Sequence, residues 1–239
     1  MLNKKITMDM THGSLWNKIL MFALPLAASS ILQQLFNSVD TAVVGRFASS
    51  QALAAVGSNS SLISLMINLF IGISLGSNVV IAHYIGQKSE KNIHAAVHTA
   101  IVVAILSGVF VMILGQFIAK PVLLLMGTPG DVIDLAVLYL RIYLIGMPFI
   151  MLYDFGSSIL RSTGDSKRPL YSLIVAGIVN TVLNLILVIV FKLGVSGVAI
   201  ATVISNVVSS SIVMVILMHE SEPIRLDVRK LTIVPVCSG

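Results

Sequence analysis

The stretch that decides the fold is NIHAAVHTAIVVAILSGVFVMILGQFIA, residues 92–119, which contains no aspartate, glutamate, lysine or arginine. A helix needs about 20 mainly apolar residues to cross the roughly 30 Å hydrocarbon core of a bilayer. Further uncharged runs of that length occur at Ile19–Val39, Phe47–Gln87, Tyr171–Phe191 and Leu193–His219. The sequence therefore predicts an all-α membrane protein.

The composition of the 239 residues supports this interpretation. Hydrophobic residues make up 56% of the chain and charged residues only 10%, and the mean hydropathy is +0.99. A soluble domain carries about 25% charged residues, because it needs a polar surface. The composition thus excludes a soluble enzyme and a disordered chain. The one cysteine, Cys237, excludes an intrachain disulfide framework.

A sixth span is possible only if residues 135–142, which include Arg141, join the apolar run that ends near Ser158. We therefore predict a bundle of six transmembrane helices over residues 14–219. The spans are expected at about 14–47, 52–85, 93–114, 131–160, 168–192 and 195–219. Residues 1–13 are predicted to form a cytoplasmic N-terminal segment, and residues 220–239 a cytoplasmic tail.

Positive charge is unevenly divided between the two sets of loops. Eleven lysines and arginines lie in the terminal segments and in the loops on the same side of the membrane as the termini. The loops on the opposite side hold only Arg46, Lys120 and Lys192. The positive-inside rule then places both termini in the cytoplasm and the chain in the plasma (inner) membrane, with the lipid bilayer as its surroundings. This asymmetry explains the net charge of +5 without a nucleic-acid partner.

Polar groups at membrane depth are the candidates for function. Gln33, Asn37 and Asp40 recur at steps of four and three, so they lie on one face of the first helix. An unpaired carboxylate in the hydrocarbon region costs several kcal/mol, so Asp40 should face a wet cavity, pair with a cation or be protonated. The alternative is that Asp40 ends the span in open solvent.

Other polar residues have structural alternatives. Asn180 and Asn184 share a face of the fifth span, where amides commonly bond neighbouring helices. Pro25 predicts a kink in the first span, and Pro148, after Gly146, predicts one in the fourth; each kink can serve as a hinge or only as packing. Arg141 and Asp154, at opposite ends of the fourth span, favour structural roles, and Arg141 can snorkel outward or pair with Asp134.

No catalytic motif accompanies these residues. A nucleophile elbow, a phosphate-binding loop and paired carboxylates at a membrane face are all missing from the sequence, so we predict neither enzymatic activity nor an organic cofactor. Gly72 and Gly76 form a small-xxx-small spacing that favours close helix packing, although the motif is weakly specific.

Four stretches together resemble the multidrug and toxic compound extrusion (MATE) family of cation-coupled antiporters. VDTAVVGR at 39–46, continuing into ALAAVG at 52–57, is similar to the family's junction between spans 1 and 2. LRSTGDSKRP at 160–169 resembles its loop between spans 4 and 5, and is the most specific match. NTVLN at 180–184 resembles the polar face of span 5, and LGVSGVAIAT at 193–202 the start of span 6.

The resemblance implies one six-helix lobe of a twelve-helix antiporter that exports organic cations in exchange for Na⁺ or H⁺. It also implies a coupling-ion site formed by Asp40, Asn180, Asn184 and Thr202, with Gln33 and Asn37 in the substrate cavity and Pro25 as the hinge. Carboxylate, amide and hydroxyl oxygens are hard ligands that suit Na⁺. Some members have Asp at the position of Asn184, so Asp40 is expected to be the only carboxylate of the site.

Three functions remain open from the sequence. The favoured one is the antiporter, with a second lobe or a second copy of the chain as partner, and with residues 220–239 as a shortened interlobe linker. The second is a lobe that inserts in the membrane without transporting, at most as an assembly partner. The third is a flippase for lipid-linked sugars, which is disfavoured because Arg141 is the one basic residue expected within the membrane.

Overall fold

The structure, a computed structural model, describes residues 15–227, with side chains from residue 20 onward. The predicted segment 1–13, Cys237 and the rest of the tail from residue 228 lie outside the described residues. The helices are α1 Leu15–Phe47, α2 Ser50–Gly86, α3 Glu90–Leu125, α4 Ile133–Ile145, α5 Met147–Ser162, α6 Lys167–Leu185, the π-helix η1 Ile186–Val190, and α7 Gly194–Met218.

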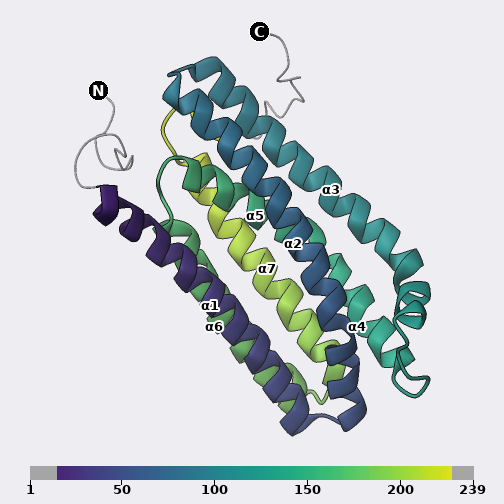
Figure 1. Ribbon diagram of the computed structural model, residues 1–239. Helices are drawn as coiled ribbons and strands as arrows, with labels where there is room; N and C mark the ends of the chain where they lie inside the picture. Colours follow the sequence, from purple (N-terminus) through teal and green to yellow (C-terminus); the bar gives the residue numbers. More distant parts are fainter. Residues whose placement is uncertain (1–14, 228–239) are drawn as a thin grey trace.

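The helices form an elongated bundle in which α1 and α6 lie side by side along one edge and α3 lies along the other (Figure 1). Within the described range, five helices are long and apolar enough to span a membrane, and α4 and α5 together make a sixth if the bent pair counts as one span. The predicted all-α, six-span lobe is therefore confirmed. The start of α1 and the end of α7 lie at the same end of the bundle, as the even number of spans requires.

Three predicted spans differ from the helices that form. The third helix runs to Leu125 rather than 114, because Pro121 does not break it and Lys120 is accommodated on its surface. The fourth span, predicted as one helix over 131–160, is two helices bent by 47° at Gly146. The fifth span changes from an α-helix to a π-helix after Leu185. Hydropathy alone reports apolar length and carries no information on such breaks.

The bend between α4 and α5 is held by close backbone contacts. Pro148 stands in the first turn of α5, where its missing N–H needs no helical partner. Gly108 of α3 lies against it: a Cβ on Gly108 would stand 2.5 Å from Pro148 Cα. Gly146, at the break itself, lies against Val203 of α7. Two neighbouring helices therefore pack directly onto the bend.

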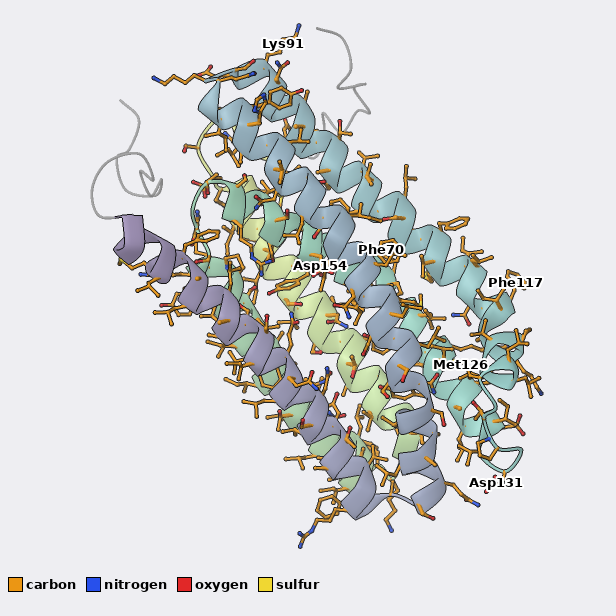
Figure 2. The ribbon with its side chains drawn as sticks, viewed as in Figure 1. Phe70, Lys91, Phe117, Met126, Asp131 and Asp154 are labelled. Carbon is orange, nitrogen blue, oxygen red and sulfur yellow. The ribbon has the colours of Figure 1, made fainter. Side chains whose placement is uncertain are left out.

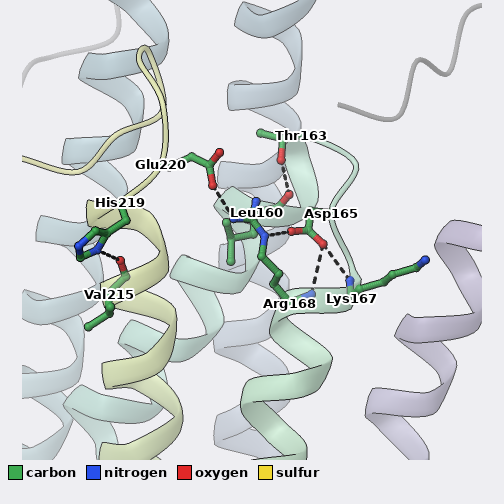
Figure 3. A network of polar contacts seen from close by, with 8 residues as sticks. All are labelled: Leu160, Thr163, Asp165, Lys167, Arg168, Val215, His219 and Glu220. Carbon is green, nitrogen blue, oxygen red and sulfur yellow. Dashed lines mark hydrogen bonds and ion pairs between the residues drawn. The ribbon is translucent and has the colours of Figure 1, made fainter. Parts of the chain in front are cut away.

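The end of the bundle near both termini is tied together by charged side chains (Figure 3). The Asp165 carboxylate accepts the backbone N–H groups of Lys167, at 3.0 Å, and Arg168, at 3.2 Å, so it caps the start of α6. The Arg168 guanidinium donates to Asp165 and, at 2.6 Å, to Glu220 after α7. This cluster fixes the α5–α6 loop to the end of α7.

The outer surface is apolar, as expected for contact with lipid. Phe117 is 76% exposed and Leu125 87% exposed on α3, whereas Phe155 and Met151 of α5 are almost fully buried. Figure 2 shows Phe117 projecting from the outer edge of the bundle. A Cβ added to Gly72 or Gly76 would meet no atom of another helix within 4 Å, so the close packing that their spacing suggested is not seen among the described residues.

Of the two alternatives for Arg141, the pairing with Asp134 does not form. The Lys120 ammonium of α3 takes that place, 3.8 Å from an Asp134 carboxylate oxygen. Arg141 is exposed, in agreement with the snorkelling alternative.

We predict that Gly108→Ala destabilises the bundle by about 1–3 kcal/mol, because the new methyl group must push α3 away from the backbone of Pro148. The measurement is the midpoint of thermal unfolding in detergent. Gly72→Ala is the matched control, because it makes the same change inside a helix but its new Cβ meets no atom of another helix within 4 Å. It should leave the midpoint unchanged or slightly higher. Equal shifts in the two variants would contradict the packing argument.

Candidate functional site

Asp40 lies inside the bundle rather than at its solvent-exposed end. The residue is 7% exposed, and it is followed by two further turns of α1 that end at Phe47. Its carboxylate oxygen Oδ1 accepts a hydrogen bond from the Asn184 amide of α6. The alternative in which Asp40 ends the span in open solvent is therefore excluded by its position.

The amides of α6 continue from this carboxylate as a hydrogen-bonded series. Asn184 Nδ2 also donates to Asn180 Oδ1 at 3.1 Å, and Asn180 Nδ2 lies 3.4 Å from Thr202 Oγ1 of α7. Thr202 Oγ1 in turn donates to the Val198 carbonyl at 3.0 Å. The four residues predicted for the coupling-ion site, Asp40, Asn180, Asn184 and Thr202, are thus brought together from three helices.

Two local features hold these helices in register. Gly177 lets α1 approach α6 so closely that a Cβ there would overlap the ring of Phe36. Because Phe36 is one turn before Asp40 and Gly177 is two turns before Asn184, this contact sets the carboxylate beside the amide. Directly after Leu185 the helix widens into the π-helix η1, a rare form that often occurs at functional sites.

The oxygen atoms at this site suit a small hard cation. Asn184 Oδ1 is buried and has no hydrogen-bond partner among the described residues, although a buried acceptor without a partner costs about 1–3 kcal/mol. Asp40 and Thr202 both line one cavity. An oxygen-rich donor set with one negative charge matches the preference of Na⁺, and the carboxylate alone matches H⁺.

A cavity of about 130 Å³ extends from this site between α1, α2, α4, α5, α6 and α7. Gln33 and Asn37 line it, as predicted, and so do the aromatic side chains of Phe36, Tyr143 and Tyr153. Cavities with mainly apolar walls and a few polar groups are typical of small-molecule sites. A second cavity shares five lining residues with the first: Asn37, Asp40, Ile67, Tyr143 and Thr202.

Pro25 lies within a continuous helix α1. Polar side chains bond the backbone around it: Ser29 Oγ donates to the Pro25 carbonyl at 2.8 Å, and Ser166 Oγ, from the α5–α6 loop, donates to the Phe22 carbonyl at 3.2 Å. Such bonds commonly accompany prolines in membrane helices. The hinge role of Pro25 remains a prediction.

The cavity also contains functional candidates that sequence reasoning did not select. Asp154 of α5 lines it, although a structural role was favoured for this residue. Three polar residues that follow Thr202 in α7, at spacings of three and four, also line it: Ser205, Asn206 and Ser209. The helical spacing of these polar residues could have marked them as one face of α7 toward a cavity. However, serine often donates a hydrogen bond to its own helix backbone, as Ser205 Oγ does to the Thr202 carbonyl, so the spacing alone is a weak indication of function.

Comparison with known proteins gives a consistent result. A family model described as MatE matches residues 25–186. The probable multidrug resistance protein YoeA of Bacillus subtilis is 37% identical, over 93% of this chain and 49% of the relative. The probable multidrug resistance protein NorM of Thermotoga maritima is 28% identical, over 86% of this chain and 45% of the relative.

Solved structures give the same picture. A MATE in the bent conformation matches with a TM-score of 0.85 and 26% identity, over 92% of this chain and 49% of that one. A MATE in the straight conformation matches with a TM-score of 0.81 and 26% identity, over 91% of this chain and 48% of that one. The chain spans about half the length of the curated relatives it matches.

We predict that Asn184→Leu destabilises the bundle by about 1–3 kcal/mol, because it removes the buried donor to Asp40 at nearly constant volume. The thermal midpoint in detergent measures the effect. Asn68→Leu is the matched control, since the Asn68 amide is exposed on α2 and bonds only the Ser64 carbonyl of its own helix among the described residues. A midpoint for Asn184→Leu equal to that of the control would contradict a structural role for this hydrogen bond.

Proposed function

The chain belongs to the MATE family of membrane transporters, and we propose that it acts as the first six-helix lobe of a cation-coupled antiporter that exports organic cations. Its relatives are named multidrug resistance and multidrug export proteins, which supports drug transport. The observation that carries the proposal is the Asp40 carboxylate, buried within the apolar bundle among amide and hydroxyl oxygens, at a residue that lines a cavity with polar and apolar walls.

In this proposal Na⁺ or H⁺ neutralises Asp40 when the cavity is open to the outside. Neutralisation removes the charge that holds α1 against the amides of α6, so α1 can rearrange about Pro25 and the bound organic cation is released. When the cavity faces inward, loss of the ion restores the negative charge, and another organic cation is attracted to the cavity. The occurrence of related structures in bent and straight conformations supports a fold with more than one shape.

The membrane potential supplies the driving force. One elementary charge that crosses the full potential contributes about 2.3 kcal/mol per 100 mV, which corresponds to a concentration ratio of roughly 50-fold. We further propose that the lobe lies in the plasma membrane with both termini in the cytoplasm. This orientation is supported by five basic residues at the end of the bundle where α1 begins: Lys88, Lys91, Arg161, Lys167 and Arg168.

A lipid-linked sugar flippase is a weaker proposal for the same fold. Such a substrate carries phosphate groups, so its cavity needs basic side chains. The residues that line the cavity beside Asp40 include two aspartates and no lysine, arginine or histidine. The charge of the cavity therefore favours a cationic substrate.

Since the chain spans half of its relatives, we propose that transport requires a second lobe, supplied by another polypeptide or by a second copy of this chain. A pseudo-symmetric transporter forms its central pathway between two lobes. A single lobe provides one wall of that pathway.

We predict that Asp40→Asn abolishes ion-driven accumulation of ethidium in inverted vesicles that contain the chain together with a second lobe. The variant cannot carry the charge that exchanges between cations, while its amide can still fit the site. Membrane insertion, measured by protease protection, should stay unchanged. Asp131→Asn is the control, because Asp131 is exposed in the α3–α4 loop, and it should transport as the parent does. Full transport by Asp40→Asn would overturn the proposal.

We also predict that the 239-residue chain transports only as part of a two-lobe assembly. Vesicles with the chain alone should show ion-driven uptake in proportion to the fraction of dimer seen by native mass spectrometry. Co-expression with a six-helix second lobe should raise uptake further if that lobe is the natural partner. Uptake by a preparation that is entirely monomeric would contradict this requirement. The lack of uptake in every arrangement would favour the non-transporting alternative.

A further inference from the structure

Asp154 is a second carboxylate in the cavity that contains Asp40. It lies on α5, within the bundle (Figure 2). It lines the cavity together with Tyr153 and Leu173. Its Oδ2 atom is buried and has no hydrogen-bond partner in the part of the chain that the structure describes. A buried carboxylate oxygen without a partner is expensive, because neither water nor protein compensates its charge.

This carboxylate belongs to a run of unpartnered polar atoms on one face of α5. Within the described residues, Ser157 Oγ and Arg161 Nε are also buried without hydrogen-bond partners, and they follow Asp154 at three and seven residues. These spacings place all three on the same side of the helix. Only Asp154 borders the cavity, so it is the one whose charge a small molecule can reach.

Asp154 lies at a different depth from Asp40. Gly146 of the bend packs on Val203, and Gly156 of α5 packs on Val213, so α5 and α7 run in the same direction with a constant sequence offset. Asp154 is therefore level with about residue 211 of α7, nine residues beyond Thr202. At 1.5 Å per residue, the two carboxylates are separated by about 13 Å along the bundle axis. Asp154 is the one nearer to the end where α1 begins.

The surroundings of the two carboxylates suit different cations. Asp40 is held by the Asn184 amide beside further oxygen atoms, a compact donor set that suits a small ion without its hydration shell. Asp154 Oδ2 has no hydrogen-bond donor among the described residues, and the cavity that Asp154 lines also presents Tyr153, Leu173 and Ile150. A negative charge beside aromatic and aliphatic surface suits a bulky lipophilic cation.

We propose that Asp154 binds the positive group of the transported organic cation, separately from the coupling ion at Asp40. This inference rests on the proposed function and specifies its substrate class: a lipophilic monocation whose charge lies about 13 Å from the coupling ion. The separation allows both cations to occupy the cavity, so exchange does not require competition for one carboxylate. Ser205, Asn206 and Ser209 of α7 line the cavity between the two levels.

The rival role for Asp154 is an internal ion pair with Arg161. The two side chains lie on one face of α5, and the charge of Arg161 acts on Asp154, but no ion pair within 4 Å forms between them in this structure. If such a pair forms in another conformation, neutralising both partners together would cancel the effect of neutralising either one. This difference separates the two roles experimentally.

The test is equilibrium binding of tetraphenylphosphonium to the purified full chain in detergent, without any ion gradient. Neutral triphenylphosphine oxide serves as a ligand of similar shape. Asp154→Asn should weaken phosphonium binding about 30-fold or more, the loss expected when a charge loses its partner in a desolvated site, and should leave binding of the phosphine oxide unchanged. Asp154→Glu should keep most of the affinity. Asp131→Asn, in the exposed α3–α4 loop, should match the parent.

The inference would be overturned if the parent did not bind phosphonium, or if Asp154→Asn did not weaken phosphonium binding. An equal loss of affinity for both ligands would also overturn it. So would a double variant, Asp154→Asn with Arg161→Gln, that binds phosphonium as the parent does. The thermal midpoint of each variant checks that it is folded. Because no transport is measured, failure here leaves the ion-coupling role of Asp40 standing, and failure of ion-driven uptake leaves this binding result standing.

Discussion

The structure depends on the accommodation of one carboxylate inside an apolar bundle. Asp40 can stay buried because α6 presents an amide to it, and that amide is in place because Gly177 lets α1 approach α6 at the level of Phe36. The free energy for this arrangement comes from the surrounding packing of apolar side chains. A change in the charge at Asp40 therefore acts directly on the contact between two helices, which is the physical basis of ion-dependent rearrangement.

The sequence predicted the parts of the fold that depend on apolar length. Six spans, the shared end of the two termini and the common face of Asn180 and Asn184 all follow from periodicity and charge. Pro148, directly after Gly146, predicted a kink in the fourth span, and the structure has a 47° bend there that the close approach of Gly108 to Pro148 accompanies. The division of that span into two helices was not predicted, because Met147 and Pro148 continue the apolar run. The π-helix after Asn184 was not predicted either, since Ile, Leu and Val suit α- and π-helices alike.

The candidate site was predicted in part, for a similar reason. A carboxylate at membrane depth is unusual enough to mark Asp40 from the sequence alone, but the convergence of Asn180, Asn184 and Thr202 came from the family resemblance and needed coordinates to be seen. For Asp154, at one end of the fourth span, a structural role was favoured. Its place in the lining of the cavity is seen only in the structure.

The two carboxylates of the cavity also constrain how exchange can work. If Asp40 were the only negative charge, an organic cation and the coupling ion would have to displace one another from the same atoms. The Asn184 amide donates to Asp40, whereas Asp154 Oδ2 has no partner among the described residues, so the proposed place of the organic cation is the second one. In this proposal coupling passes through the shape of the bundle, by way of the α1–α6 contact. The energy that links the two cations is then the difference in how well each shape tolerates the charge at Asp40.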